Sequence, residues 1–426
     1  MRQDMGVETN MIRKTIQNAT TYIKVFAKWT LLAILVGLVG GVVGSLFHEA
    51  VDYVTNLRAG HTWLVFLLPV GGLAIAGLYN LCKKSGKIDT NRVFESVRTD
   101  EKIPFVMAPL IFVSTVITHL FGGSAGREGA ALQLGGSIGY RLGKLFKLNS
   151  RDLHVIVMAG MSSVFAALFG TPLAAMFFAL EVTSVGVMYY AALLPCAVAA
   201  LVGAGVALLF GISPVRFSEV VMQSASVEVV AKAVILAVLC ALVCMLFCMA
   251  IKKCEHFAEK WLPNKYLRAA VGAAVIVLLT VLVGNQDYNG AGMHIISNAM
   301  AGTARPEAFI LKIIFTAITI SAGFKGGEIV PTFFIGSTFG CVLGGLLGLE
   351  PGFGAALGFV ALFCGVVNCP VASVMLAAEI FGVDSILVFA VVCGVTYMMS
   401  GYCSLYSSQK IMYSKLEARY INQDTK

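Results

Sequence analysis

Charged residues are scarce in this chain. Of its 426 residues only 13% are charged, whereas 58% are hydrophobic, and the mean hydropathy is +0.85. A soluble globular protein carries roughly 25% charged residues, so the composition excludes an ordinary soluble domain. Apolar stretches of about 20 residues, which is the length of a membrane-spanning helix, occupy positions 29–47, 63–79, 229–250 and 269–283. The chain is therefore expected to be an all-α, multi-pass membrane protein.

Motifs for metal binding or catalysis are also missing. The chain has eleven cysteines and six histidines, but no Cys-x-x-Cys, His-x-x-His or His-Glu-x-x-His spacing. Cys240, Cys244 and Cys248 share one helical face, which is typical of buried thiols that act as small hydrophobic groups. No catalytic pair of an intramembrane protease is recognisable. We therefore expect no metal, no cofactor and no enzymatic activity.

Proline is rare, with 11 residues, whereas glycine is abundant, with 44. This balance is typical of helices that approach closely or break inside a membrane. The apolar segments at 130–144, 329–347, 359–367 and 371–380 are too short to cross a bilayer straight. Short helices expose backbone N–H groups at their N-termini, and these groups attract anions. The pattern favours an anion as the substrate.

Basic residues are not gathered into one patch, although the net charge is +8. They lie at the chain ends and in the connections, so no nucleic-acid partner is expected. The first 28 residues have a basic excess, which predicts a cytoplasmic N-terminus, and 11–28 could form a helix on the membrane surface. No cleavable signal precedes the first span, and the tail is short. Both features suit a bacterial inner membrane.

The sequence repeats itself about halfway along. Gly-Arg-Glu-Gly at 126–129 recurs as Gly-Gly-Glu at 326–328, an offset of 200. Thr-Pro-Leu-Ala at 171–174 precedes Glu181, and Cys-Pro-Val-Ala at 369–372 precedes Glu379, an offset of 198. A glutamate in a Gly-rich break in both halves is typical of duplicated transporters with a polar site at mid-membrane. We expect a cytoplasmic helix (1–28), two membrane repeats (29–212 and 227–406) and a short cytoplasmic tail (407–426).

Glu128 follows five small residues and Arg127. The backbone can therefore come close to a bound ion, and Glu128 lies at or just before the start of a helix. An ionised carboxylate there would compete with a diffusible anion for the same N–H groups. A protonated carboxyl would leave the site and carry a proton. The alternative is an ion pair between Glu128 and Arg127 that stabilises the helix start.

These motifs identify a family resemblance. The 126–129 motif with Gln133 and Gly136, followed by 326–331 with Phe334 and Gly336, resembles the CLC family of chloride channels and proton-coupled anion antiporters. The resemblance covers essentially the whole chain. It implies two inverted repeats with broken and short helices, and a homodimer with a separate pore in each subunit. It also implies that Glu128 is the gating glutamate and that the Tyr406 hydroxyl donates to the central anion.

Departures from the family pattern bear on the choice of ion. Asp-Thr-Asn-Arg-Val at 89–93 replaces the family's Gly-Ser-Gly-Ile-Pro, so Thr90 offers a hydroxyl and Asn91 an amide. The asparagine, and Glu328 in Gly-Gly-Glu, resemble the fluoride-exporting branch. Val182 stands where chloride antiporters carry their internal proton acceptor. Against this, the fluoride branch generally has threonine where this chain has Val330, and Asp-Thr is not its usual opening.

The resemblance thus implies proton-coupled export of fluoride, with a chloride/proton antiporter or a passive anion channel as alternatives. Expected partners are fluoride or chloride ions, protons, the lipid bilayer and a second copy of the chain. Glu328 is expected to handle protons or line the pore, or alternatively to cap the next helix beside Lys325. Glu181 and Glu379 are expected to be mainly structural. The candidate site comprises Glu128 and Glu328 for gating and protons, and Thr90, Asn91, Gly126, Arg127, Gly129, Ile329, Val330 and Tyr406 for the anion.

Overall fold

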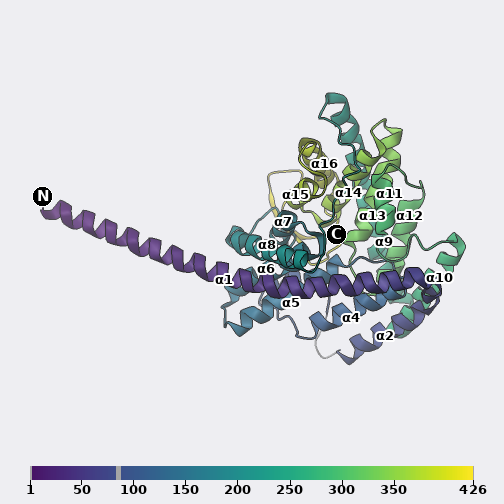
Figure 1. The fold of residues 1–426 in the computed structure, drawn as a ribbon, viewed down its shortest axis with the longest axis horizontal. Helices are drawn as coiled ribbons and strands as arrows, with labels where there is room; N and C mark the ends of the chain where they lie inside the picture. Colours follow the sequence, from purple (N-terminus) through teal and green to yellow (C-terminus); the bar gives the residue numbers. More distant parts are fainter. Residues whose placement is uncertain (1, 83–87, 426) are drawn as a thin grey trace.

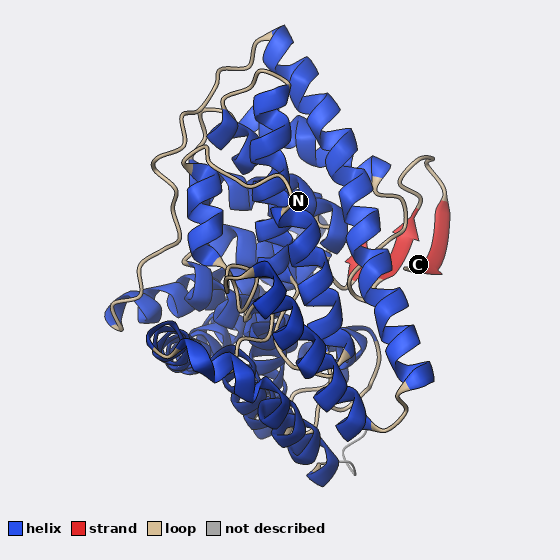
Figure 2. Cartoon of the chain, turned by 90° about the vertical axis from the view of Figure 1, so that its right-hand side faces the viewer, coloured by secondary structure: helices blue, strands red, loops and turns tan. Residues whose placement is uncertain are grey.

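The chain folds into a bundle of helices (Figures 1 and 2). The computed structural model describes residues 2–82 and 88–425, and this part contains sixteen α-helices. Seven helical segments there are long and apolar enough to cross a membrane, and they include all four predicted spans. The all-α membrane fold is thereby confirmed. The helices are α1 (Arg2–Gly60), α2 (Leu68–Leu81), α3 (Thr90–Arg98), α4 (Met107–Leu120), α5 (Glu128–Leu145), α6 (Ser150–Phe169), α7 (Pro172–Glu181), α8 (Leu193–Leu209), α9 (Val227–Trp261), α10 (Lys265–Val283), α11 (Met293–Met300), α12 (Ala308–Ser321), α13 (Ile329–Leu346), α14 (Pro351–Val367), α15 (Pro370–Phe381) and α16 (Ile386–Met399).

Helix α1 is longer than the sequence suggested. It runs for 59 residues without a break at Lys28, so the expected surface helix continues directly into the first span. Its N-terminal part extends away from the body of the protein, and its C-terminal part packs along the bundle (Figure 1). Residues 19–35 of this helix include neither proline nor glycine, which explains why the helix does not end there.

Two helix pairs pack at backbone distance. Helix α5 lies against α6, and α13 lies against α14. A Cβ on Gly135 would come within 2.2 Å of the Gly160 carbonyl oxygen, and one on Gly336 within 2.3 Å of the Gly358 oxygen. Glycine is therefore required at equivalent places in both halves, because any side chain would force the helices apart.

Helices α7 and α15 contact each other (Figure 1). Each has a glutamate near its C-terminus, and that glutamate accepts backbone N–H groups of the other helix. The Glu379 carboxylate accepts the N–H groups of Leu173 and Ala174, both at 2.9 Å. The Glu181 carboxylate accepts those of Val371 and Ala372, at 3.3 and 2.8 Å. Each carboxylate thus caps the N-terminus of the other helix.

The tail forms strands, which the sequence did not predict. Strands β1 (Ser184–Val185), β2 (Lys410–Tyr413) and β3 (Tyr420–Asp424) make a sheet in that order, with β1 and β2 parallel and β2 and β3 antiparallel. The sheet lies at one edge of the bundle (Figure 2). Just before β2, the Gln409 side chain donates to the Val182 and Val367 carbonyls, at 2.8 and 2.7 Å. The tail is therefore attached to the ends of α7 and α14.

Candidate anion site

The two repeated glycine-rich loops meet in the interior. Gly126 and Gly327 form an antiparallel bridge, with N–H to oxygen distances of 2.6 and 2.7 Å. Helix α5 begins two residues after the first loop glycine, and α13 begins two residues after the second. The bridge therefore brings two helix N-termini, with their unpaired N–H groups, to one place.

The Glu128 carboxylate lies between these two N-termini. Its side chain is 1% exposed, and it accepts the Arg127 N–H at 3.0 Å. Backbone N–H groups of Glu128 itself and of Val330 also donate to it. Gly126, Gly129, Ile329 and Val330, all predicted to bind the anion, surround or adjoin this carboxylate. A carboxylate held by N–H groups from two helices occupies a position suited to a small anion.

Arg127 has a closer acidic partner than Glu128. Its Nη1 atom lies 2.7 Å from Asp52 Oδ1, whereas its Nε atom is 3.9 Å from Glu128 Oε1. Asp52 also pairs with His48 Nε2, at 3.1 Å. Arg127 therefore pairs more closely with Asp52 than with Glu128, which weakens the alternative interpretation of the motif as an Arg127–Glu128 ion pair.

Glu328 immediately precedes α13, but its side chain makes no capping hydrogen bond. Its Oε2 atom lies 3.4 Å from the position that a Cβ on Gly129 would occupy. Lys325, Asp89 and Glu255 are near enough to act on it electrostatically. The backbone N–H of Glu328 itself donates to the carboxylate, but no N–H of the first turn of α13 does so, and Glu328 lies close to the α5 loop.

A second group of candidate residues lies where α3 meets the segment before β2. The Thr90 hydroxyl accepts Gln133 Nε2 at 3.0 Å, which leaves the Thr90 proton for another acceptor. Asn91 Oδ1 accepts the Ser408 N–H at 3.0 Å, so its NH₂ group points the other way. The Tyr406 hydroxyl is buried and has no hydrogen-bond partner among the residues that the structure describes. The Thr90 hydroxyl, the Asn91 amide and the Tyr406 hydroxyl are thus the candidate donors to a ligand.

Phe94 and the two glutamates tie this group to the loops. The Phe94 ring packs edge-on against the Tyr406 ring, with centroids 4.9 Å apart. Tyr406 is near enough to both Glu128 and Glu328 to interact electrostatically. Gln133 was visible in the sequence motif, but its partner was not. Ser408 and Asp52 carried no sequence signal, because each acts on a residue more than seventy positions away.

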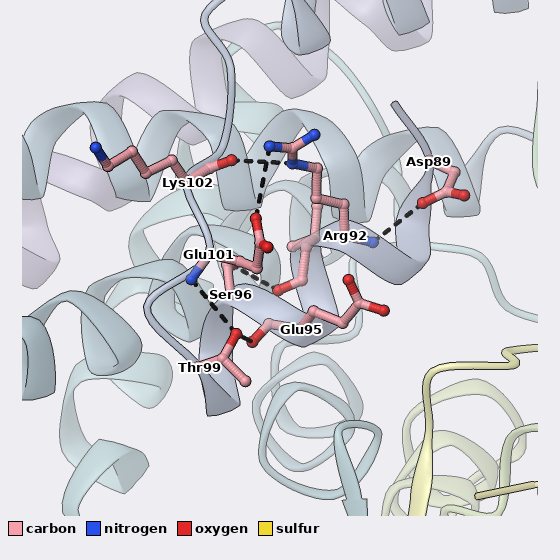
Figure 3. Close-up of polar contacts among 8 residues, drawn as sticks. Asp89, Arg92, Glu95, Ser96, Thr99, Glu101 and Lys102 are labelled. Atoms are coloured by element: carbon pink, nitrogen blue, oxygen red, sulfur yellow. Dashed lines mark hydrogen bonds and ion pairs between the residues drawn. The ribbon is translucent and has the colours of Figure 1, made fainter. Parts of the chain in front are cut away.

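Cavities approach the site from two directions. One of about 310 Å³ reaches Glu128 and is lined by Asp52, Arg58 and Arg127 among others. The other, of about 1170 Å³, lies between the end of α3 and the tail sheet and includes Arg92, Ser408 and Asp424. Figure 3 shows the polar contacts at its α3 side, where Arg92 Nε donates to the Lys102 carbonyl at 2.9 Å. The smaller cavity thus reaches Glu128 itself, whereas the larger one reaches Ser408, the backbone partner of Asn91.

Among the side chains that the structure describes, in residues 19–82 and 88–425, no group of three His, Cys, Asp or Glu could hold a metal ion. The cysteines in this part of the chain are free thiols.

A buried carboxylate between two helix N-termini, with unpartnered donors behind it, defines a membrane protein that handles anions. Comparison with known proteins gives the family. Residues 71–401 match the model of the voltage gated chloride channel family. The chain belongs to this family and is an integral membrane protein.

Relatives of this chain include anion-handling proteins. A chloride/fluoride channel protein of Pseudomonas syringae pv. tomato is 37% identical over 91% of this chain and 88% of that protein. The crystal structure of a CLC-type fluoride/proton antiporter superposes with a TM-score of 0.86, at 33% identity over 90% of this chain and 98% of that one. A slow cyanobacterial Cl⁻/H⁺ antiporter has a TM-score of 0.74 at 21% identity, with 87% and 94% coverage, and shares the fold.

Proposed function

We propose that this protein exports fluoride across a bacterial inner membrane in exchange for protons. The observation that carries the proposal is the position of the Glu128 carboxylate, which accepts N–H groups from the starts of both α5 and α13. Ionised, it fills a place built for an anion. Protonated, it has less claim on those N–H groups and can exchange its place with fluoride while carrying a proton.

The other candidate residues have complementary roles in this proposal. Thr90, Asn91 and Tyr406 supply donors to an anion on the inner side of Glu128. Glu328 carries protons along the inner part of the route, because it lies beside the same loops and makes no capping bond. Arg127 holds the gate loop, residues 122–127 just before α5, in place through its ion pair with Asp52. The similarity to a fluoride/proton antiporter and to a chloride/fluoride channel protein supports fluoride as the ion.

The working unit is proposed to be a homodimer in the lipid bilayer, with the N-terminus and the tail on the cytoplasmic side. The basic excess of the N-terminal segment supports this orientation.

Val182 motivates a second candidate, a passive anion channel of the same fold. It is buried at the end of α7, and its carbonyl accepts the Gln409 side chain. Its side chain cannot carry a proton, so a chloride/proton antiporter that uses an acid at this position is disfavoured. A channel needs no inner proton acceptor. Proton coupling is therefore the property to measure.

The test is ion efflux from liposomes that contain the purified protein, loaded with fluoride or chloride, with external pH recorded. Fluoride should leave faster than chloride, and protons should enter. Glu128→Gln should still pass the anion but should no longer move protons, whereas Glu259→Gln, at an exposed surface carboxylate, should behave as wild type.

Each other outcome changes the assignment. If Glu128→Gln still pumps protons under an anion gradient, Glu128 is not the gate. Chloride efflux equal to or faster than fluoride efflux removes fluoride as the preferred ion. Efflux without any pH change makes the protein a channel.

A further inference from the structure

Two buried cations lie beside the gate loop without an acidic partner. Arg58, near the end of α1, is 8% exposed, and Lys312, on α12, is fully buried. In the part of the chain that the structure describes, neither forms an ion pair; their hydrogen bonds go to backbone carbonyls. The two are close enough to repel each other. This corner of the protein therefore carries positive charge that no carboxylate compensates.

Arg58 lies in a cradle made by two glycines. Its Nη1 atom donates to the His119 carbonyl at 3.0 Å. A Cβ on Gly290 would lie 2.7 Å from Arg58 Nη2, and one on Gly122 would lie 3.3 Å from Nη1. Both glycines have positive φ, at +61° and +84°. The guanidinium thus lies in close contact with the backbone at Gly290 and at Gly122, in the segment that leads to Glu128.

Lys312 contacts a second loop, residues 288–290, which contains Gly290. Its Nζ atom donates to the carbonyls of Tyr288 and Gly290, at 3.2 and 2.7 Å, and lies 4.9 Å from the centre of the Phe334 ring. The loop is joined to the gate segment by Asn289 Nδ2, which donates to the Gly122 carbonyl at 2.9 Å. The Lys312 ammonium therefore lies on a loop that is hydrogen-bonded to the gate loop.

A neutral side-chain donor could also hydrogen-bond to the backbone carbonyls that Arg58 and Lys312 contact, so these contacts do not explain why both side chains are charged. A buried charge without a counter-ion is costly, because it loses its hydration and gains no ion pair. Arg58 lines the cavity of about 310 Å³ that also reaches Glu128. His119 lines the same cavity, is 1% exposed, and its Nε2 atom has no partner. A buried polar atom without a protein partner, on a residue that lines a cavity, is one that a bound water or ion would satisfy.

The acidic residues around this cavity do not cancel the charge of Arg58. Asp52 is paired with Arg127 and His48. Glu128 is held by the N–H groups of the two helix starts. The remaining titratable group in the lining, His294, faces Asp287 at 3.3 Å. Arg58 is thus the lining charge that has no counter-ion.

We propose that this cavity is a separate binding site for a small monovalent anion, held against Arg58 on the far side of Glu128 from Tyr406. With the N-terminus in the cytoplasm, this is the outer side of the gate, because Arg58 lies at the opposite end of α1. The inference rests on anion transport as the proposed function. An ion that waits here is available when the Glu128 carboxylate leaves the two helix starts, and an exported ion passes through it on the way out.

Calorimetric titration of the purified full-length protein with sodium fluoride, and separately with sodium chloride, tests the site. Arg58→Gln should lose one bound anion per chain or weaken that binding by at least about tenfold, since a charged contact is removed. Arg58→Lys keeps the charge and should retain the site. Arg141→Gln removes an exposed positive charge beside Phe105, on another part of the molecule, and should bind as wild type.

Asn56→Asp gives an independent measurement should Arg58→Gln fail to fold. Asn56 is exposed and lines the cavity, so a carboxylate there should compete for Arg58 and weaken anion binding. A folded Arg58→Gln or Asn56→Asp protein that binds anions with unchanged number and affinity overturns the proposal and leaves Arg58 as a clamp on the loop. Liposome efflux by wild type decides the proposed function separately, because it needs no substitution at Arg58.

Discussion

Glu181 and Glu379 each cap the helix that carries the other. The four N–H groups that they accept belong to the first turns of α15 and α7, which lack partners inside their own helices. Because both carboxylates are committed to this exchange, their place in the structure is explained without transport chemistry. If both residues are structural, replacing either one should lower the stability of the protein without changing how many protons move per anion.

Glu181→Ala and Glu379→Ala should each destabilise the protein and leave proton coupling intact. Each substitution leaves two N–H groups at a helix start without an acceptor, at about 1–3 kcal/mol for a buried unsatisfied group. Thermal unfolding in detergent should show the loss, while the ratio of protons to anions in liposomes should match wild type. A changed ratio in either variant would assign that glutamate to the proton route instead.

Gly327→Ala should disrupt the gate. An added Cβ would lie 2.4 Å from the Gly129 nitrogen and 3.0 Å from the Glu128 nitrogen, so the two loops would have to separate. We expect loss of both anion flux and proton coupling. Gly77→Ala, in helix α2, is the matched control, because a Cβ there meets nothing within 4 Å. That change should leave transport unaltered and add up to about 1 kcal/mol of stability. Normal flux in Gly327→Ala would mean that the close bridge is dispensable.

The sequence predicted features that depend on local pattern. Glu128 and Glu328 could be placed at helix starts because a glycine-rich run followed by an apolar stretch is a local signal. The four apolar spans followed from length and hydropathy in the same way. The boundary at residue 28 was set by charge, whereas the helix continues because its local residues favour it.

Long-range partners could not be predicted. The bridge between Gly126 and Gly327 joins loops 201 positions apart, and only the folded chain brings them together. The pairing of β2 with β1, a two-residue strand more than 220 positions earlier, was missed for this reason, whereas the pairing of β2 with β3 is local. Asp52 was missed as the partner of Arg127 for the same reason. The positions of the residues in the candidate site are described by the structure, while their roles in transport stay predictions.

Gln133 should act on the anion through Thr90. Its Nε2 atom donates to the Thr90 hydroxyl and so directs the proton of that hydroxyl away, toward the pore. Thr90→Val and Gln133→Leu should each weaken anion binding by roughly tenfold, about one hydrogen bond. The double variant should be little worse than Thr90→Val alone, since Gln133 acts on the anion only through the Thr90 hydroxyl. Titration with fluoride measures all four proteins. Additive losses would show that Gln133 and Thr90 act independently.

Glu328→Gln should slow proton movement more than anion movement. The glutamine keeps the size and the neutral form of the side chain but cannot release a proton, and Glu328 lies beside the same loops as Glu128. Proton uptake per fluoride exported should therefore fall, while fluoride flux persists. Lys325→Gln removes a cation next to Glu328 without removing its carboxyl, so it should retain coupling. Equal proton-to-fluoride ratios in wild type and Glu328→Gln would exclude Glu328 from the proton route.

Gln409→Leu should detach the tail from the transport domain. Gln409 donates to the carbonyls of Val182 and Val367 and accepts from Asn368 Nδ2, so leucine removes three hydrogen bonds and leaves buried polar groups with fewer partners. Each such group costs about 1–3 kcal/mol. We expect a lower unfolding temperature and faster trypsin cleavage at Arg419 in the tail. Lys410→Gln removes only the exposed pair with Asp424, at 3.5 Å, which contributes about 0–1 kcal/mol. Because Gln409 joins the ends of α7 and α14, cleavage without loss of thermal stability would show that the tail is a separate unit.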